Sequence, residues 1–242
     1  MNLESSLGID QGGKGAREEH WIPLADIMTG LMMMFLLVAI VFMIKVQTDA
    51  DRISDIAILY DQTREDIYKD LQHEFQDDLP KWGATLSPDL TIRFREPDVL
   101  FDTGRDALKP KFSAILSDFF PRYIRILTEP KYRAAIEEIR IEGHTSSVWN
   151  GSTPVEDAYF QNMALSQART RSALQYVLEL PAIATQRDWL RAHLTANGLS
   201  SSKLIHRADG SEDREASQRV EFRVRTNADA RLAQMLRAAG QK

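Results

Sequence analysis

Residues 21 to 44 read Trp-Ile-Pro-Leu-Ala-Asp-Ile-Met-Thr-Gly-Leu-Met-Met-Met-Phe-Leu-Leu-Val-Ala-Ile-Val-Phe-Met-Ile, and Asp26 is their only charged residue. A helix rises 1.5 Å per residue, so roughly 20 apolar residues cross the hydrocarbon core of a bilayer. Trp21 stands where an interfacial aromatic anchor is expected, and Lys45 can reach the polar surface at the other end. We therefore predict a single transmembrane helix over residues 21–45, preceded by an N-terminal tail of residues 1–20.

Two other interpretations of this stretch are disfavoured. It is too long and begins too late for a cleaved signal peptide, and no Ala-x-Ala site follows it. The polar segments on both sides disfavour a buried helix of a soluble domain. The Lys and Arg residues on the two sides are balanced, so the positive-inside rule does not set the orientation of the helix.

The composition of the whole chain limits what the protein can be. Hydrophobic residues make up 43% of the 242 residues and the mean hydropathy is negative, which excludes a polytopic membrane protein. The net charge of −5, without a basic stripe, argues against nucleic acid as a direct partner. There is no cysteine, and no two of the five histidines have the spacing of metal ligands. We expect no metal site, no cofactor and no enzymatic activity.

Asp26 lies inside the apolar stretch, where an acid costs roughly 2.5–3.5 kcal/mol and is therefore expected to have a function. A low dielectric favours the neutral carboxyl, whereas contact with a water path favours the ionised one. Thr29 follows three residues later on the same helix face, and its hydroxyl can bind the carboxyl or a hydrated ion. We predict that Asp26 and Thr29 carry an ion, either H⁺ or Na⁺. The alternative is that Asp26 reaches headgroup water and only sets the helix boundary.

Residues 46–85 are polar and helix-prone, and we interpret them as a helical connector. Apolar positions recur in it at spacings of three and four, near a heptad: Ile53, Ile56, Tyr60, Thr63 and Ile67. Pro80 and Gly83 end the pattern. Such a helix either pairs with its copy in a homodimer or rests on the next domain.

Strands and helices alternate over residues 86–227, which predicts an α/β sandwich with helices against one sheet. The expected strands are residues 91–95, 136–143 and 219–225, and the expected helices are residues 109–120, 156–179 and 188–194, with Asn197-Gly198 as a C-cap. On the helix 156–179 we expect these inward positions: Phe160, Met163, Ala164, Leu174 and Val177. His144 is expected to be a structural hydrogen-bonding residue, and residues 228–242 a helical tail.

The run Leu24-Ala-Asp-Ile-Met-Thr-Gly-Leu-Met-Met33 resembles the transmembrane motif of MotB-type stator subunits. The resemblance implies that Asp26 binds the permeating ion. It also implies that two copies of this helix sit inside a ring of five MotA-type subunits, and that the connector acts as a plug. A lone helix cannot enclose an ion path, so a partner is required on physical grounds as well.

Four ordered motifs resemble the OmpA-like peptidoglycan-binding domain over residues 90–226. They are Phe101-Asp-Thr-Gly104 with Leu108-Lys-Pro110, Ile141-Glu-Gly-His-Thr145, Asn162-Met-Ala-Leu-Ser-Gln-Ala-Arg169, and Gln218-Arg-Val-Glu-Phe222. The resemblance implies that Arg169 pairs with a carboxylate of the stem-peptide diaminopimelate, with Asn162 and Leu165 beside it.

At one position of this implied site the chain departs from the family. The family has an aspartate after Gly-His-Thr, which holds the ammonium of the ligand, whereas Ser146 follows Thr145 here. A hydroxyl is a weaker partner for an ammonium than a carboxylate is. The departure puts affinity or ligand choice in question, unless one of three nearby acids substitutes: Glu142, Glu156 or Asp157.

Together these features predict a single-pass bacterial inner-membrane protein with a cytoplasmic N-terminus and a periplasmic, wall-binding C-terminal domain. The leading hypothesis is the MotB-like subunit of an ion-driven motor. The short acidic tail and the Gly-His-Thr-Ser-Ser run resemble the ZorB-type subunits of Zorya anti-phage systems, which implies a ZorA-like ring and cytosolic defence effectors as partners. The alternatives are a flagellar stator subunit and a passive tether between membrane and wall.

Overall fold

The computed structural model describes residues 21–95 and 100–227, without the side chains of residues 21–23, 49–50 and 52–61. The expectations for the tails 1–20 and 228–242, and for the side chains of Trp21, Ile53, Ile56 and Tyr60, lie outside this description. The chain forms two compact units, residues 1–55 and 56–242, which are described separately.

The first helix, α1 (Trp21–Phe75), contains both the expected span and most of the expected connector. Nothing interrupts it because there is no proline between residues 24 and 79, and Pro23 stands in its first turn. Among the described residues, one helical stretch, Leu24–Thr48, is long and apolar enough to cross a membrane. All side chains of that stretch are exposed, as a lipid-facing or subunit-facing surface would be in a chain taken alone.

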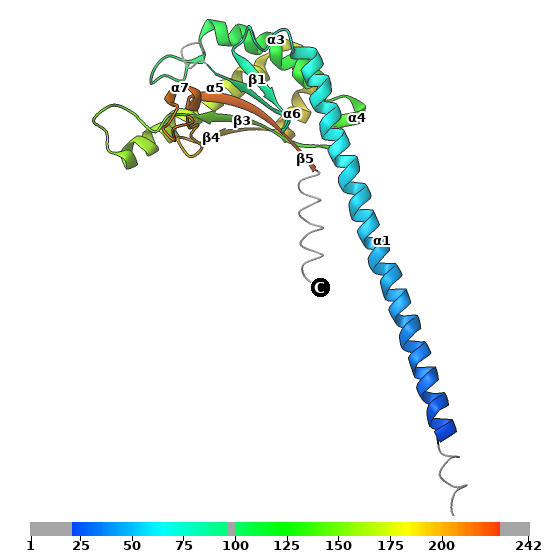
Figure 1. The fold of residues 1–242 in the computed structure, drawn as a ribbon. Coiled ribbons are helices and arrows are strands. Elements are labelled where there is room, and N and C mark those ends of the chain that lie inside the picture. The colour runs from blue at the N-terminus through cyan, green and yellow to red at the C-terminus, as the bar shows by residue number, and fades with distance from the viewer. Residues whose placement is uncertain (1–20, 96–99, 228–242) are drawn as a thin grey trace, which may run out of the picture. The chain divides into compact units, whose positions relative to one another are not determined.

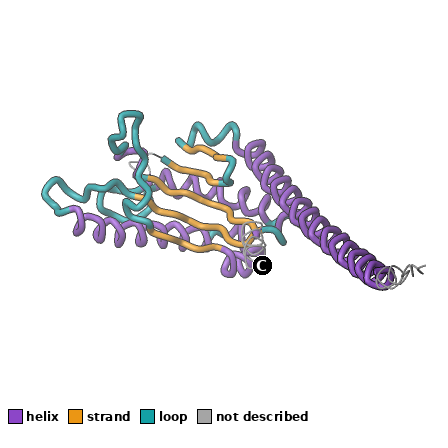
Figure 2. The backbone as a smooth tube through the Cα atoms, turned by 60° about the horizontal axis from the view of Figure 1, so that its bottom comes forward, coloured by secondary structure: helices purple, strands orange, loops and turns teal. Residues whose placement is uncertain are grey.

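The second unit is built on a five-stranded sheet with the order β1-β2-β5-β3-β4 (Figures 1 and 2). The strands are β1 (Ala84–Ser87), β2 (Thr91–Phe94), β3 (Ile136–His144), β4 (Leu194–Gly198) and β5 (Arg219–Thr226). All neighbouring strands are antiparallel except β3 and β4, which are parallel and joined by a helical crossover. The longer helices α3 (Pro110–Leu127) and α5 (Val155–Glu179) lie against one face of the sheet (Figure 1). Short helices complete the unit: α4 (Pro130–Arg133), η1 (Pro181–Gln186), α6 (Arg187–His193) and α7 (Arg214–Ser217). The predicted α/β sandwich is confirmed.

The end of α1 belongs to the core of this unit. Ile67, Leu71 and Phe75 recur every four residues on one helix face and are fully buried. Phe75 packs on Phe119 of α3 at 5.4 Å between ring centroids, and Phe119 packs on Phe222 of β5 at 5.2 Å. Over these turns the helix therefore rests on its own domain. Ile67, one of the five positions expected to face a partner helix, is thus buried in its own domain. Homodimer formation through the connector stays a prediction.

Two details of the predicted elements are wrong. Asn197 and Gly198 do not cap a helix, because α6 ends at His193 and the chain continues as β4 beside β3. On α5, Phe160 is 69% exposed and Ala164 is exposed, whereas Val177 is buried as expected. The buried stripe of α5 consists mainly of small and polar residues: Ala158, Asn162, Ser166, Thr170, Ala173 and Val177.

Close packing explains this stripe. Gly143 of β3 and Gly198 of β4 are paired neighbours under α5. A Cβ atom on Gly198 would lie 2.2 Å from the backbone nitrogen of Gln167, and one on Gly143 would lie 2.6 Å from Cγ2 of Thr170. The two glycines let α5 approach the sheet so closely that large apolar side chains do not fit between the helix and the sheet.

Candidate functional site

One pocket of ≈ 280 Å³ brings together all five residues that the sequence assigned to wall binding. It lies where β3 ends, beside the N-terminal half of α5. The predicted residues that line it are Thr145, Ser146, Asn162, Leu165 and Arg169. The other lining residues are Thr103, Gly104, Val148, Trp149 and Gln218.

The pocket is assembled by the register of α5 over the end of β3. Asn162, Leu165 and Arg169 are three and four residues apart, so they share one helix face. Asn162 is 3% exposed, and its Nδ2 donates a hydrogen bond of 3.1 Å to the carbonyl oxygen of Ser146. This bond fixes the start of the loop after β3 against the helix.

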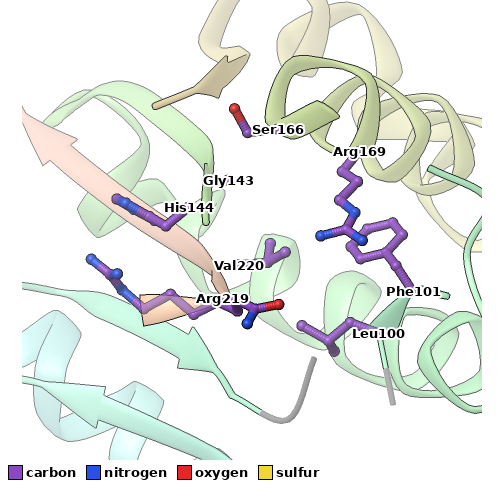
Figure 3. Close-up of a pocket in the computed structure, with 9 residues that line it drawn as sticks. Leu100, Phe101, Gly143, His144, Ser166, Arg169, Arg219 and Val220 are labelled. Atoms are coloured by element: carbon purple, nitrogen blue, oxygen red, sulfur yellow. The ribbon is translucent and has the colours of Figure 1, made fainter. Parts of the chain in front are cut away.

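Arg169 is held in place by the loop that begins at Phe101. Its Nε donates to the carbonyl oxygen of Arg105 at 2.9 Å, and its Nη2 donates to that of Asp102 at 3.0 Å. The guanidinium carbon lies 4.9 Å from the ring centroid of Phe101, and Figure 3 shows the two side chains next to each other. Burial lowers the pKa of Arg169, although Asp106 opposes the shift, and an arginine remains protonated in proteins. The carbonyl bonds occupy only part of its five N–H donors, so the guanidinium can still donate to an anion.

Among the residues that the structure describes, those that line the pocket include no carboxylate. Glu156 and Asp157 are exposed in the first turn of α5, and Glu142 is buried beside His144, so none of the three acids considered as substitutes lines the pocket. Ser146 donates from Oγ to the carbonyl oxygen of Val148 at 3.3 Å. A ligand ammonium in this pocket would therefore meet hydroxyl, amide and carbonyl oxygens.

Sequence reasoning missed two large side chains of the pocket, Trp149 and Gln218. An aromatic residue in the loop just after a binding motif was the available signal for Trp149. Gln218 opens the last of the four motifs, but nothing in its type indicated a binding role. The hydroxyl of Thr145 is buried and has no hydrogen-bond partner among the described residues.

His144 is buried and points away from Arg169, as Figure 3 shows. Its Nε2 lies 3.8 Å from Glu142 and 3.7 Å from Glu221, and neither ring nitrogen has a partner at hydrogen-bond distance among the described residues. The expectation of a structural hydrogen-bonding histidine therefore stays a prediction.

Asp26 and Thr29 lie on α1 within the candidate span. The Thr29 hydroxyl donates a hydrogen bond of 2.7 Å to the carbonyl oxygen of Ala25. Its oxygen can still accept from a protonated carboxyl or contact a cation. Both residues are exposed in the single chain, so any enclosure around them requires another subunit.

Comparison with solved structures supports the fold assignment. The fold resembles the crystal structure of a MotB-like protein from Desulfovibrio vulgaris, with a TM-score of 0.51 and 21% identity, covering 70% of this chain and 98% of that one. The periplasmic domain of Helicobacter pylori MotB matches at a TM-score of 0.39 and 18% identity, over 60% of this chain and 83% of that one, which is too distant to support an argument. The chain thus shares its fold with the MotB-like protein from Desulfovibrio vulgaris.

The sequence comparison is more specific. The chain is 42% identical over 235 residues to the Zorya protein ZorB of Escherichia coli strain ATCC 8739, covering 97% of this chain and 99% of the relative. The chain belongs to the ZorB family. No family model matches it.

Proposed function

We propose that this chain is the MotB-like subunit of an ion-driven motor of the Zorya anti-phage type, anchored to the cell wall. The observation that carries the proposal is the combination, in one ZorB-family chain, of an apolar helix with a single acid and a domain whose pocket gathers Arg169, Asn162 and Thr145. In this proposal residues 1–20 lie in the cytoplasm. The second unit lies in the periplasm, because peptidoglycan is found only there.

Asp26 is the ion carrier in this mechanism, and Thr29 supplies a nearby hydroxyl oxygen. One charge that crosses 100 mV of membrane potential releases about 2.3 kcal/mol, which is sufficient to bias a conformational step. The exposed apolar surface of α1 packs against a ring of MotA/ZorA-like subunits, with two copies of this chain inside five of the partner. The ring transmits torque to the cytosol, where defence effectors respond.

The wall anchor is the pocket around Arg169. A guanidinium that is positioned by two carbonyl oxygens and an aromatic ring is preorganised to receive a carboxylate. Peptidoglycan stem peptides carry such carboxylates. The anchor prevents this subunit from turning with the ring, so ion flow becomes rotation of one part against the other.

The substitution Asp26→Asn tests the motor. It keeps the size of the side chain and removes its titration, so we expect loss of ion flux through proteoliposomes that contain the full chain and its ring partner, and loss of phage protection. Asp51→Asn is the matched control, because Asp51 is an exposed acid on the same helix beyond the span. If the Asp26 variant keeps both activities, the chain is a passive tether, which is the second candidate function.

The substitution Arg169→Ala tests the anchor. We expect the full-length variant in detergent to lose most of its co-sedimentation with purified peptidoglycan. Arg171→Ala is the matched control, because Arg171 is exposed on the same helix and does not line the pocket. Unchanged sedimentation of the Arg169 variant would remove the pocket from the mechanism. A flagellar role is disfavoured by the ZorB relationship along almost the whole chain.

A further inference from the structure

Three buried side chains meet on the face of the sheet opposite α3 and α5. Glu142 and His144 are two residues apart on β3, so they point to the same face, and Glu221 of β5 is paired directly with Glu142. Their exposed fractions are 3%, 3% and 1%. His144 Nε2 lies 3.8 Å from Oε2 of Glu142 and 3.7 Å from Oε2 of Glu221, and the three candidate ligand atoms all lie within 4.8 Å of one another.

These atoms lack the partners that buried polar atoms normally have. Both ring nitrogens of His144 and Oε2 of Glu142 make no hydrogen bond among the described residues. An unsatisfied buried polar group is costly, and native structures contain few of them. The separations of 3.7 and 3.8 Å are too long for hydrogen bonds. They are close to the spacing of about 3.4 Å between ligands that surround a tetrahedral ion with bonds of about 2.1 Å.

Neighbouring arginines bind the opposite oxygen of Glu221 and lie near that of Glu142. Arg93 and Arg219 each donate from Nε to Oε1 of Glu221 at 2.7 Å. Nη1 of Arg140 lies 4.0 Å from Oε1 of Glu142. The two hydrogen bonds to Oε1 of Glu221 leave its Oε2 toward His144, as outer-shell groups orient the ligands of metal sites. Arg140 is beyond hydrogen-bond distance and contributes only its charge beside Glu142. Nη2 of Arg223 lies 3.7 Å from Oε2 of Glu221, which is also beyond hydrogen-bond distance.

The directions of two pKa shifts are compatible with this arrangement. Burial and the nearby Arg219 lower the pKa of His144, against the opposing effect of Glu221 and Glu142. Burial alone would raise the pKa of Glu221, but its interactions with His144, Arg219 and Arg93 hold that pKa well below its usual range. A neutral imidazole and an ionised carboxylate are the forms that bind metal ions.

We propose that Glu142, His144 and Glu221 form a binding site for one divalent transition-metal ion, for which Zn²⁺ is the best fit. One imidazole and two carboxylates match Zn²⁺, whereas Ca²⁺ and Mg²⁺ prefer oxygen ligands alone. Three protein ligands leave a fourth position for water. The ion joins β3 to β5 immediately before Thr145 and Ser146, so it stabilises the end of the strand from which the wall-binding pocket begins.

Metal analysis of the untagged full chain in detergent tests the site. After treatment with a chelator and dialysis against Zn²⁺, we expect one Zn²⁺ per chain. We also expect Co²⁺ to give the strong visible absorption of a four-coordinate ion. The unfolding midpoint should rise by about 5–10 °C when Zn²⁺ is a hundredfold above its Kd, and Ca²⁺ and Mg²⁺ should not reproduce the shift.

Variants assign the metal to these residues. His144→Gln and Glu142→Gln should each abolish stoichiometric Zn²⁺ uptake and the midpoint shift, and far-UV circular dichroism shows whether each variant is folded. His206→Gln is the matched control, because His206 is exposed on a loop. If one variant does not fold, the other and the wild-type chain still decide the result. A wild-type chain that takes up no Zn²⁺, or a folded ligand variant that binds it as before, would overturn the proposal. So would a His144 imidazolium seen by NMR in the presence of Zn²⁺, because the histidine would then bridge the two acids by charge.

Discussion

Arg122 of α3 donates a hydrogen bond from Nε to Oε1 of Glu74, 2.8 Å away in the last turn of α1. Its Nη2 donates to the carbonyl oxygen of the same residue at 2.9 Å, and its Nη1 donates to Oδ2 of Asp78 at 2.9 Å. The guanidinium also lies 4.9 Å from the ring centroid of Phe75. One side chain thus satisfies a carbonyl at the helix C-terminus, where carbonyls lack intrahelical partners, and fixes the end of α1 to the domain.

Replacement of Arg122 should therefore weaken the attachment of α1. We expect Arg122→Ala to lower the free energy of unfolding by about 2–3 kcal/mol, because it removes charge-assisted hydrogen bonds to two half-buried carboxylates and one to a helix-end carbonyl. Of the described residues, Arg125 then remains as the cationic partner of Glu74, and Lys81 as that of Asp78. Urea unfolding of the full chain in detergent, followed by tryptophan fluorescence, measures the loss. Arg191→Ala is the control, since that pair with Asp188 is exposed and should contribute less than about 0.5 kcal/mol. Equal effects of the two variants would contradict this role of Arg122.

Asp70 of α1 is attached to α4, and the stability that this attachment contributes should depend on pH. Nζ of Lys131 and the hydroxyl of Tyr132 each donate to Oδ2 of Asp70 at 2.7 Å. These hydrogen bonds hold the pKa of Asp70 below its ordinary value of 3.8, and burial together with the Asp70 carboxylate raises the pKa of Tyr132 to about 12. Because the folded-state pKa of Asp70 is depressed, its contribution is complete above the unfolded pKa and is lost as the pH falls through the folded value.

The substitution Asp70→Asn tests this dependence. At neutral pH we expect the variant to be less stable than the wild type by about 1 kcal/mol, a modest value because the carboxyl is partly exposed. The difference should stay constant down to about pH 5 and then shrink toward about pH 3, as the wild-type carboxyl becomes protonated. Urea midpoints measured across this range check the prediction. A stability difference that grows on acidification would show that folding does not lower the pKa of Asp70.

The two glycines under α5 should tolerate no side chain. In Gly198→Ala the new Cβ would lie 2.2 Å from the backbone nitrogen of Gln167 and 2.6 Å from its Cα, and backbone cannot yield as a flexible side chain can. We expect a loss of about 3 kcal/mol of unfolding free energy, and weaker peptidoglycan binding because α5 carries Arg169. Gly151→Ala is the control, since a Cβ there meets nothing within 4 Å. A Gly198 variant as stable as that control would contradict the close packing of helix and sheet.

The parts of the fold that the sequence predicts are those with strong patterns. The long apolar run is recognisable from its length, and strands such as Thr91–Phe94 and Arg219–Thr226 from the alternation of apolar and polar residues along them. The inward face of α5 was not recognisable, because the paired glycines admit a stripe of small polar residues in place of large apolar ones. The short strand β4 was hidden for a different reason. Its Asn-Gly end has the residue types of a helix cap, and only the pairing with β3 distinguishes the two.

Of the candidate sites, too, one could be predicted from sequence patterns and one could not. The five pocket residues could be predicted because ordered motifs contain them, and the fold then brings them to one place. The cluster of Glu142, His144 and Glu221 could not be predicted from spacing, because its third member comes from β5, 77 positions along the chain from His144. Trp149 was missed because a loop has no periodicity from which the direction of a side chain could be inferred.

The described lining of the pocket includes no carboxylate, and this gives a prediction in which function should improve. In Ser146→Asp the added carboxylate would lie among described lining residues that offer neutral oxygens to a ligand ammonium, while the bond from Asn162 to the backbone of residue 146 is kept. A charge-assisted hydrogen bond is stronger than a neutral one by about 1.4 kcal/mol or more, so we expect about tenfold tighter binding of soluble peptidoglycan fragments that carry a free ammonium. Calorimetric titration of the full chain in detergent measures the affinity, and added salt should reduce the gain. Ser152→Asp is the control, because it adds the same charge on an exposed loop outside the pocket lining. If both variants gain equally, the effect is long-range charge; if neither gains, the ammonium is bound elsewhere or is not part of the recognised group.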